Sequence, residues 1–316
     1  MKYKIGVDLG GTNIAAGIVD ESNNIIASKS TKTNLPRPRE EVEALIAQLC
    51  IDIAQQSKIN FTDIACVGIG TPGSVDPSTG IVGFNANFAY HDWHLAQAME
   101  KLLKCKVYVE NDANAAAYGE YLAGAAKGAA SAVMITLGTG IGGGIIIDNK
   151  IYAGFNKAGA ELGHMVIDIG GRPCMCGRKG CWEKYASARS LAEDTKAAML
   201  SDKNTLMWKI VDNNIDNVNA KTAFEAMKKG DIAGTALVEK YVDYIACGLI
   251  NVINIFQPQI ICIGGGVSHE GDALLEKLQN RIDKEDYARS SNLRTRICMA
   301  KLYNNAGIIG AANLGK

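Results

Sequence analysis

The chain contains 316 residues, 47% of them hydrophobic and 21% charged, and its 33 Lys and Arg residues balance 33 Asp and Glu residues. This length exceeds the usual size of a single hydrophobic core, so we expect two domains. A net charge of zero argues against a general binder of nucleic acid or membrane surfaces, which needs a basic excess. The first residues do not resemble a secretory signal, and nine cysteines then suit a reducing compartment, so we expect a cytoplasmic protein.

Short runs rich in β-branched residues alternate with helical patterns, which is typical of the α/β class. Strands are predicted, in chain order, at residues 4–7, 15–19, 65–69, 106–109, 133–137, 144–147 and 259–263. Helices are predicted at 41–53, where the apolar residues share one face, and at 235–255, which ends before Pro258. Residues 8–20 align without gaps with residues 136–148, and both segments have the order strand, glycine turn, strand, Asp. This repeat favours two duplicated domains.

Three glycine-rich turns follow predicted strands. Glycine lets backbone N–H groups approach an anion with no Cβ in the way. The candidates for holding a nucleotide are Gly10, Gly11 and Thr12, then Gly138, Thr139, Gly140 and Gly142, then Gly264, Gly265 and Gly266. Asp8 precedes the first turn and can bind magnesium through water, while the third turn suits a base or ribose. A plain hairpin is the alternative for any one turn, but three together favour a nucleotide site.

The second turn also matches the dinucleotide-binding fingerprint, because Gly138, Gly140 and Gly143 have the spacing G-x-G-x-x-G. That fingerprint requires a helix to follow, whose N-terminus receives the pyrophosphate. Here residues 144–148 are Gly-Ile-Ile-Ile-Asp, which favour a strand. An NAD-dependent enzyme is therefore disfavoured.

A metal site is predicted where three cysteines crowd into eight positions. Cys174, Cys176 and Cys181, with His164 upstream, form the Cys₃His set of a structural zinc site. Glu161 and Glu183 flank these ligands, and carboxylates form strong hydrogen bonds to sugar hydroxyls. If one ring nitrogen of His164 binds zinc, the other can face the same ligand.

A candidate general base lies at the end of the strand predicted at 106–109. Asp112 follows Asn111 and precedes a helix rich in small residues. Asp112 could merely cap that helix, as Asp commonly does. The polar neighbours favour a second interpretation, in which Asp112 takes the proton of a sugar hydroxyl and Asn111 positions the sugar.

These motifs together resemble the ROK family of bacterial sugar kinases, close to its glucokinases. The resemblance rests on residues 8–12, 110–114, 137–143, 161–164 and 174–183, and it covers nearly the whole chain. It implies an actin-like, hexokinase-like fold with two ribonuclease-H-like domains flanking a cleft, ATP and Mg²⁺ between the first two glycine turns, and often a homodimer. The sugar ligands would be Asn111, Asp112, Glu161, His164 and Glu183, with Asp112 as the base and glucose as the first-choice substrate.

The resemblance also bears on the domain boundaries, on a further sugar contact and on the alternative functions. We expect a small domain at 1–118, a large domain at 119–300 with the zinc loop at 164–183, and residues 301–316 packed back on the small domain. A further sugar contact is expected at Asn87, with Asn85 as the alternative. Gln257-Pro258 replaces the usual Asn-Pro of the family.

Kinases of N-acetylglucosamine, N-acetylmannosamine, fructose or mannose share the sugar-binding residues and are alternatives to a glucokinase. A sugar-responsive repressor is disfavoured, because the first strand is predicted near residue 3 and no DNA-binding module is expected before it.

Overall fold

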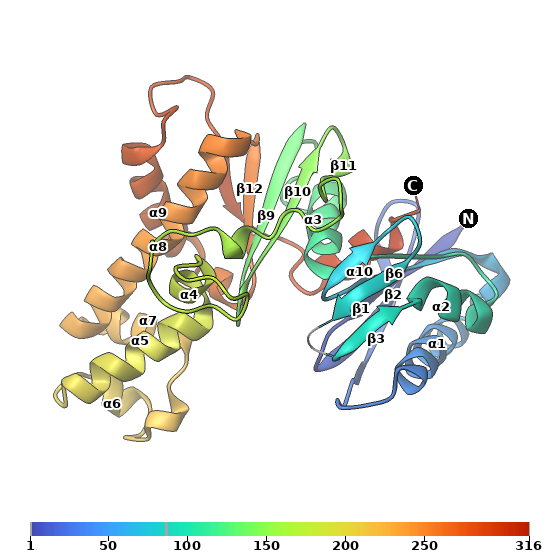
Figure 1. Ribbon diagram of the computed structural model, residues 1–316, viewed down its shortest axis with the longest axis horizontal. Coiled ribbons are helices and arrows are strands. Elements are labelled where there is room, and N and C mark those ends of the chain that lie inside the picture. Colours follow the sequence, from blue (N-terminus) through green and yellow to red (C-terminus); the bar gives the residue numbers. More distant parts are fainter. Residues whose placement is uncertain (1, 86–87, 316) are drawn as a thin grey trace. The chain divides into compact units, whose positions relative to one another are not determined.

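The computed structural model describes residues 2–85 and 88–315, and the chain folds into two compact units (Figure 1). Unit 1 comprises residues 1–134, 144–160 and 300–316, and unit 2 comprises residues 135–143 and 161–299. The boundary predicted between 118 and 119 falls inside one continuous helix, α3 (Asp112–Ala123), so it does not mark the end of a compact unit. Residues 300–316 belong to unit 1.

Unit 1 is built on a five-stranded sheet. Its strands are β1 (Tyr3–Leu9), β2 (Asn13–Val19), β3 (Ile25–Lys32), β4 (Ile64–Thr71) and β8 (Val107–Asn111), in the order β3-β2-β1-β4-β8. β1 pairs antiparallel with β2 and parallel with β4, and β4 pairs parallel with β8. Because parallel strands end at the same edge, Asp8, Thr71 and Asn111 come to one side of this sheet.

Helices cover both faces of this sheet. Ile5 and Val7 of β1 point into a core shared with α1 (Arg39–Gln56) and α2 (Leu95–Leu103). Gly6 points the other way, and a Cβ there would lie 1.8 Å from the backbone oxygen of Ile308 in α10 (Asn305–Ala312). Alternate residues of a strand face opposite sides of the sheet, so the glycine lets α10 pack directly on the strand backbone. α3 packs beside α10.

Smaller elements complete unit 1. A three-stranded antiparallel sheet in the order β5-β6-β7 consists of β5 (Ser74–Asp76), β6 (Ile81–Asn85) and β7 (Tyr90–Trp93). The sequence patterns did not predict these short strands. The 3₁₀ helix η1 (Phe61–Asp63) leads into β4.

The second five-stranded sheet repeats the strand order of the first. Its order is β11-β10-β9-β12-β13, with β9 (Ser131–Leu137), β10 (Ile141–Ile147), β11 (Lys150–Ile151), β12 (Ile260–Gly264) and β13 (Arg296–Met299). The second glycine turn joins β9 to β10 as the first turn joins β1 to β2. The similarity between residues 8–20 and 136–148 thus extends to the order of the strands. β10 also occupies the place where a dinucleotide site would need a helix.

Helices dominate unit 2. They are α4 (Glu183–Ala186), α5 (Ala188–Ser201), α6 (Met207–Ile210), α7 (Ala220–Lys228), α8 (Ile232–Phe256) and α9 (Gly271–Glu285), with 3₁₀ helices η2 (Leu162–His164), η3 (Ile215–Asn217) and η4 (Gly266–Glu270). α8 begins at the Asp231 side chain, which accepts from the Gly234 amide at 2.6 Å, and it ends at the left-handed Gln257 before Pro258. No helix in the described part of the chain is both long and apolar enough to cross a bilayer.

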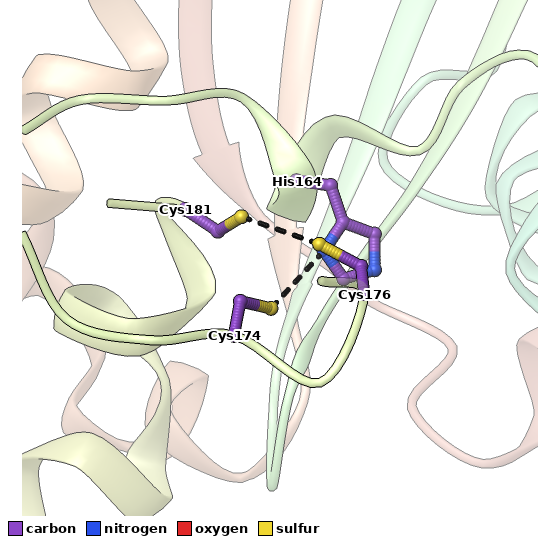
Figure 2. A group of neighbouring side chains, drawn as sticks. All are labelled: His164, Cys174, Cys176 and Cys181. Carbon is purple, nitrogen blue, oxygen red and sulfur yellow. Dashed lines mark hydrogen bonds between the residues drawn. The ribbon is translucent and has the colours of Figure 1, made fainter. Parts of the chain in front are cut away.

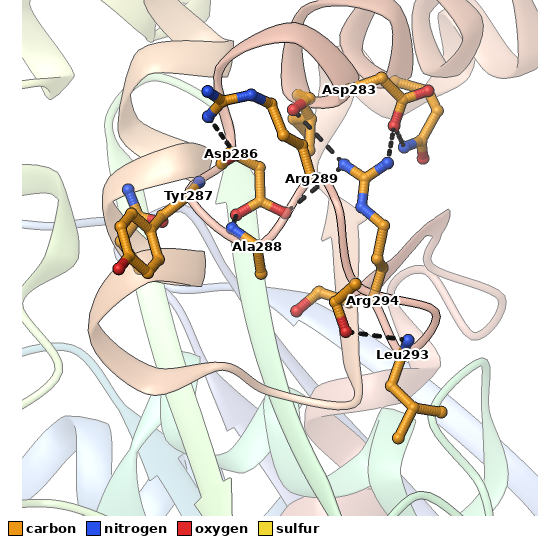
Figure 3. A network of polar contacts seen from close by, with 12 residues as sticks. Asp283, Asp286, Tyr287, Ala288, Arg289, Leu293 and Arg294 are labelled. Carbon is orange, nitrogen blue, oxygen red and sulfur yellow. Dashed lines mark hydrogen bonds and ion pairs between the residues drawn. The ribbon is translucent and has the colours of Figure 1, made fainter.

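An ion-pair network fixes the connection from α9 to β13 (Figure 3). The guanidinium of Arg294 lies 2.7 Å from the Asp283 carboxylate and 3.4 Å from that of Asp286. Asp286 is buried and also accepts the Ala288 amide at 3.0 Å. Since Asp286 has two donors in a buried position, we expect this network to matter for stability.

Candidate functional site

The carboxyl edge of the first sheet brings two acids together. Asp8 near the end of β1 is paired in register with Gly70 of β4, whose missing side chain leaves room beside the Cα of Asp112. Burial raises the pKa of Asp112. Burial, and then the nearby charge of Asp112, raises the pKa of Asp8 from 3.8 to about 6. Two partly buried carboxylates are hard oxygen donors that suit Mg²⁺, so the residues present fit that ion.

Asn111, and not Asp112, occupies the N-cap position of α3. The Asn111 side-chain oxygen accepts from the backbone N–H groups of Ala113 at 2.9 Å and Asn114 at 3.2 Å. Its amide nitrogen donates to the Gly73 carbonyl at 3.2 Å. Asp112 is the first residue of the helix and accepts from the Ala113 amide at 2.9 Å. The helix therefore has a cap without Asp112, whereas the predicted sugar contact Asn111 is already engaged at both side-chain atoms.

Glu110 supports this edge, and the sequence interpretation missed its role. The side chain is buried, and one carboxylate oxygen accepts from the Asn111 amide at 2.8 Å and from the Asn114 side chain at 3.0 Å. Burial raises the pKa of Glu110. Through these two hydrogen bonds Glu110 holds the turn from β8 into α3.

The first glycine turn lines a cavity of about 640 Å³ in unit 1. The wall of this single cavity includes Gly10, Gly11, Thr12 and Asp8. Thr33 braces the turn from outside the cavity: its hydroxyl donates to the Gly10 carbonyl at 2.7 Å and its amide to the Thr12 carbonyl at 2.9 Å. The lining residues that were not predicted include Asn304 and Asn305, from the far end of the chain. Their only signal in the sequence is a polar pair directly before a small-residue helix.

Several backbone N–H groups of the second glycine turn already have hydrogen-bond acceptors. Gly138 donates to the Gly140 carbonyl at 3.0 Å, and Gly142 donates to the Thr136 hydroxyl at 3.2 Å. Ile141 donates to the Glu183 carboxylate at 2.9 Å. Among the described residues, the backbone N–H groups of Thr139 and Gly140 have no acceptor, so they are the turn's candidates for an anion. Gly138 and Gly142, predicted in that role, instead stabilise the turn.

The third glycine turn opens onto a pocket of about 480 Å³ within unit 2. Gly266 lines it together with Thr139 of the second turn. Gly265 has a positive φ and packs closely against Leu137, whose carbonyl oxygen would lie 2.5 Å from a Cβ built on Gly265. Apolar side chains and a few polar ones are typical of a pocket for a planar base. The lining residues that were not predicted are Ala188, Arg189, Ala192, Val218, Asn219, Ala220, Lys221, Phe224, Val267 and Glu270.

The predicted metal ligands converge in unit 2 (Figure 2). The ligand atoms of His164, Cys174, Cys176 and Cys181 all lie within 4.8 Å of one another. Cys174 Sγ is 3.6 Å from His164 Nδ1, and Cys176 Sγ is 3.6 Å from Cys181 Sγ. A tetrahedral zinc ion with ordinary bond lengths requires ligand separations of about 3.6–3.8 Å. The donor set and its spacing therefore fit zinc, bound through Nδ1 of His164.

Glycines shape the loop that carries these ligands. Gly177 and Gly180 both have positive φ, and a Cβ at Gly180 would lie 1.7 Å from the Asp168 carbonyl. Directly after Cys181, the buried Trp182 donates from its indole nitrogen to the Tyr244 carbonyl at 2.7 Å. This anchor on α8 fixes the start of α4, where Glu183 lies.

Of the two asparagines proposed to contact sugar in unit 1, only Asn85 can be described. Asn85 is fully buried and donates to the Pro72 carbonyl at 2.6 Å, and its oxygen accepts from the Phe88 amide at 3.3 Å. These contacts connect the end of β6 with Pro72 and Phe88. Asn87 lies outside the described residues.

Comparison with known proteins places the chain in a family. The ROK family model matches residues 4–316. A glucokinase of Thermotoga maritima is 36% identical, over 99% of this chain and 96% of its own length. This chain belongs to the ROK family.

Solved ROK structures share the fold. The crystal structure of a ROK family glucokinase from Streptomyces griseus in complex with glucose and AMPPNP has a TM-score of 0.84 and 34% identity, covering 99% of this chain and 98% of that one. The predicted actin-like, hexokinase-like α/β fold is thereby confirmed. The ROK family also includes regulators: a xylose repressor of Bacillus subtilis is 28% identical, and the match covers 76% of that protein.

Proposed function

We propose that this ROK protein is an ATP-dependent sugar kinase that phosphorylates a hexose hydroxyl, with glucose as the preferred substrate and glucose 6-phosphate as the product. The main support is the position of Asp112. Its pKa is raised by burial, it neighbours Asp8, and Asp8 belongs to the cavity lined by the first glycine turn. A proton acceptor is thus next to a place suited to phosphate.

In this mechanism the sugar oxygen forms a bond to the γ-phosphorus of ATP while the bond from that phosphorus to the β-phosphate oxygen breaks, which releases ADP. Asp112 accepts the hydroxyl proton as the oxygen attacks. Asp8 would hold Mg²⁺ through water, and the bound ion would neutralise phosphate charge. The chain's main contributions are to align the sugar with the phosphate and to take up the proton.

The proposal gives roles to residues of the glycine turns, the sugar contacts and the metal ligands. The amides of Thr139 and Gly140 would donate to phosphate, and the pocket at Gly266 would take the base. Glu161, His164, Glu183 and Asn87 would form hydrogen bonds to sugar hydroxyls. Asn111 would donate the side-chain amide hydrogen that does not bond to the Gly73 carbonyl. Zinc on His164 and the three cysteines would fix the loop that carries His164 and Glu183.

The preference for glucose rests on the relatives and not on a residue that excludes other sugars. A coupled assay of ADP release should therefore compare glucose with N-acetylglucosamine, N-acetylmannosamine, fructose and mannose. We expect the highest kcat/KM for glucose. A higher value for an N-acetylated sugar would overturn the glucose assignment and leave the sugar-kinase assignment standing, and no turnover with any hexose would overturn both.

Two further parts of the proposal concern partners. We propose a homodimer, which sedimentation of the purified protein would test against a monomer.

The repressor relatives suggest the competing function, which is that of a sugar-responsive DNA-binding protein. A protein that bound operator DNA in a sugar-dependent manner, without ADP release, would support that alternative and contradict the kinase.

A further inference from the structure

Glu183 occupies the space beside Gly140. The Glu183 carboxylate accepts the Ile141 amide at 2.9 Å through Oε2. A Cβ built on Gly140 would lie 2.2 Å from that same oxygen and 3.1 Å from Cδ, well inside contact distance. A side chain at position 140 and the Glu183 carboxylate in this position therefore exclude each other.

The conformation of the turn gives no other reason for glycine at this position. The φ angle of Gly140 lies outside the left-handed range, so a positive φ is not the reason for glycine here. Gly138 in the same turn has no atom within 4 Å of a built Cβ. The space around a built Cβ thus differs between two glycines of one turn, because Glu183 lies beside Gly140.

A second segment approaches the same turn. A Cβ at Gly163 would lie 2.3 Å from the Ile141 carbonyl oxygen, so η2 packs directly against the backbone of Ile141. Ile141 is therefore held at its N–H by Glu183 and contacted at its carbonyl by Gly163. Gly163 precedes the metal ligand His164, and Glu183 follows the metal ligand Cys181 by two residues. The metal cluster closes this set of contacts within unit 2.

We propose that Gly140 and Glu183 act together as a positioning pair, which sets the sugar-binding carboxylate against the phosphate-binding turn. Oε2 of Glu183 is committed to the turn, and Oε1 remains for a sugar hydroxyl. Gly140 then serves sugar binding by leaving space for Glu183, in addition to the role of its amide toward phosphate. This inference rests on the sugar-kinase function proposed above.

Calorimetric titration of four variants with glucose and, separately, with AMPPNP tests the pair. Gly140→Ala keeps the amide and adds only a methyl group, so it should weaken glucose binding by about tenfold or more while the Kd for AMPPNP changes by less than about threefold. Gly138→Ala adds a methyl group to the same turn in open space and should leave the Kd for glucose within about threefold of the wild type.

The decisive comparison uses Glu183→Asp, both alone and combined with Gly140→Ala. The shorter side chain will itself weaken glucose binding, but it leaves room for a methyl group at position 140. In this background Gly140→Ala should cost less than about threefold in the Kd for glucose, because the two changes are coupled. If Gly140→Ala does not fold, the double variant should fold, and failure of both to fold would overturn the inference.

The outcomes separate this inference from the function on which it rests. A wild-type protein that binds no hexose would contradict the sugar-kinase proposal. A wild-type protein that binds glucose, with unchanged glucose affinity in Gly140→Ala or with fully independent effects in the double variant, would contradict the positioning pair alone.

Discussion

Asp8 and Asp112 are neighbouring carboxylates, and the charge of Asp112 adds to burial in raising the pKa of Asp8 to about 6. Two like charges held close together with reduced solvation destabilise the folded protein in the absence of a cation. The pair therefore has the properties of a functional site, where local stability is given up for chemistry.

This relationship predicts how stability depends on pH. The folded-state pKa of Asp8 lies above its ordinary value of 3.8, so its stabilising effect is complete below about pH 4 and is lost as the pH rises to about 6. Above pH 6 the ionised Asp8 carboxylate therefore destabilises the folded state. Asp8→Asn cannot ionise, so it should raise the free energy of unfolding at pH 8, without magnesium, by at most about 3 kcal/mol. Denaturant unfolding at pH 8 and pH 4 measures the difference.

The gain should shrink toward pH 4, where Asp8 is protonated in the folded state and about half protonated in the unfolded state. The same variant should lose most of its kinase activity. A variant less stable than the wild type at pH 8 would contradict the account of Asp8.

The two asparagines near β6 should behave differently when replaced by alanine. Asn85→Ala removes buried hydrogen bonds to Pro72 and Phe88 and should destabilise the protein by about 1–3 kcal/mol. Asn87→Ala should raise the KM for glucose, because it removes the proposed sugar contact. Thermal melts and kinetics on both variants test the assignment, which fails if Asn87→Ala has wild-type kinetics.

Metal analysis of the purified protein should find about one zinc ion per chain. Cys176→Ser should lose the ion and weaken glucose binding, because the loop bearing His164 and Glu183 is then less well fixed. Cys105→Ser changes a half-buried cysteine outside the cluster and should retain the zinc. Fully active protein without zinc would rule out this role.

The network in Figure 3 should affect stability and not catalysis. Asp286→Ala leaves the Arg294 guanidinium with one carboxylate fewer in a partly buried place, which should cost about 2 kcal/mol. Asp283→Ala removes the more exposed partner and should cost less than about 1 kcal/mol. Denaturant unfolding compares them, with kcat expected near wild type in both; equal costs would contradict the burial argument.

Patterns that are local in sequence allowed much of this to be predicted. The segments 8–20 and 136–148 are rich in β-branched residues and glycine. β1 and β9 end in these segments, and β2 and β10 lie within them. The metal ligands could be predicted because three of the four lie within eight positions, and the structure brings them together with His164.

What could not be predicted depends on long-range packing or on backbone angles. Asn304 lines the cavity at the first glycine turn from the far end of the chain, and Phe224 lines the pocket at Gly266 from α7. Neither has a neighbouring motif. The choice of Asn111 over Asp112 as the cap of α3 depends on which residue has extended φ and ψ angles, and two adjacent polar residues do not reveal that.

The transfer of labelled γ-phosphate from ATP to glucose, measured for the wild type and for Asp112→Asn, tests the central claim most directly. The wild type should form labelled glucose 6-phosphate. The variant should do so about 10²-fold or more slowly with similar ATP affinity, because it lacks only the proton acceptor. Its residual rate should also lose the decline toward acid pH that protonation of Asp112 imposes on the wild type. The account would be contradicted if the wild type transferred no label to glucose, or if the variant kept half of the wild-type kcat.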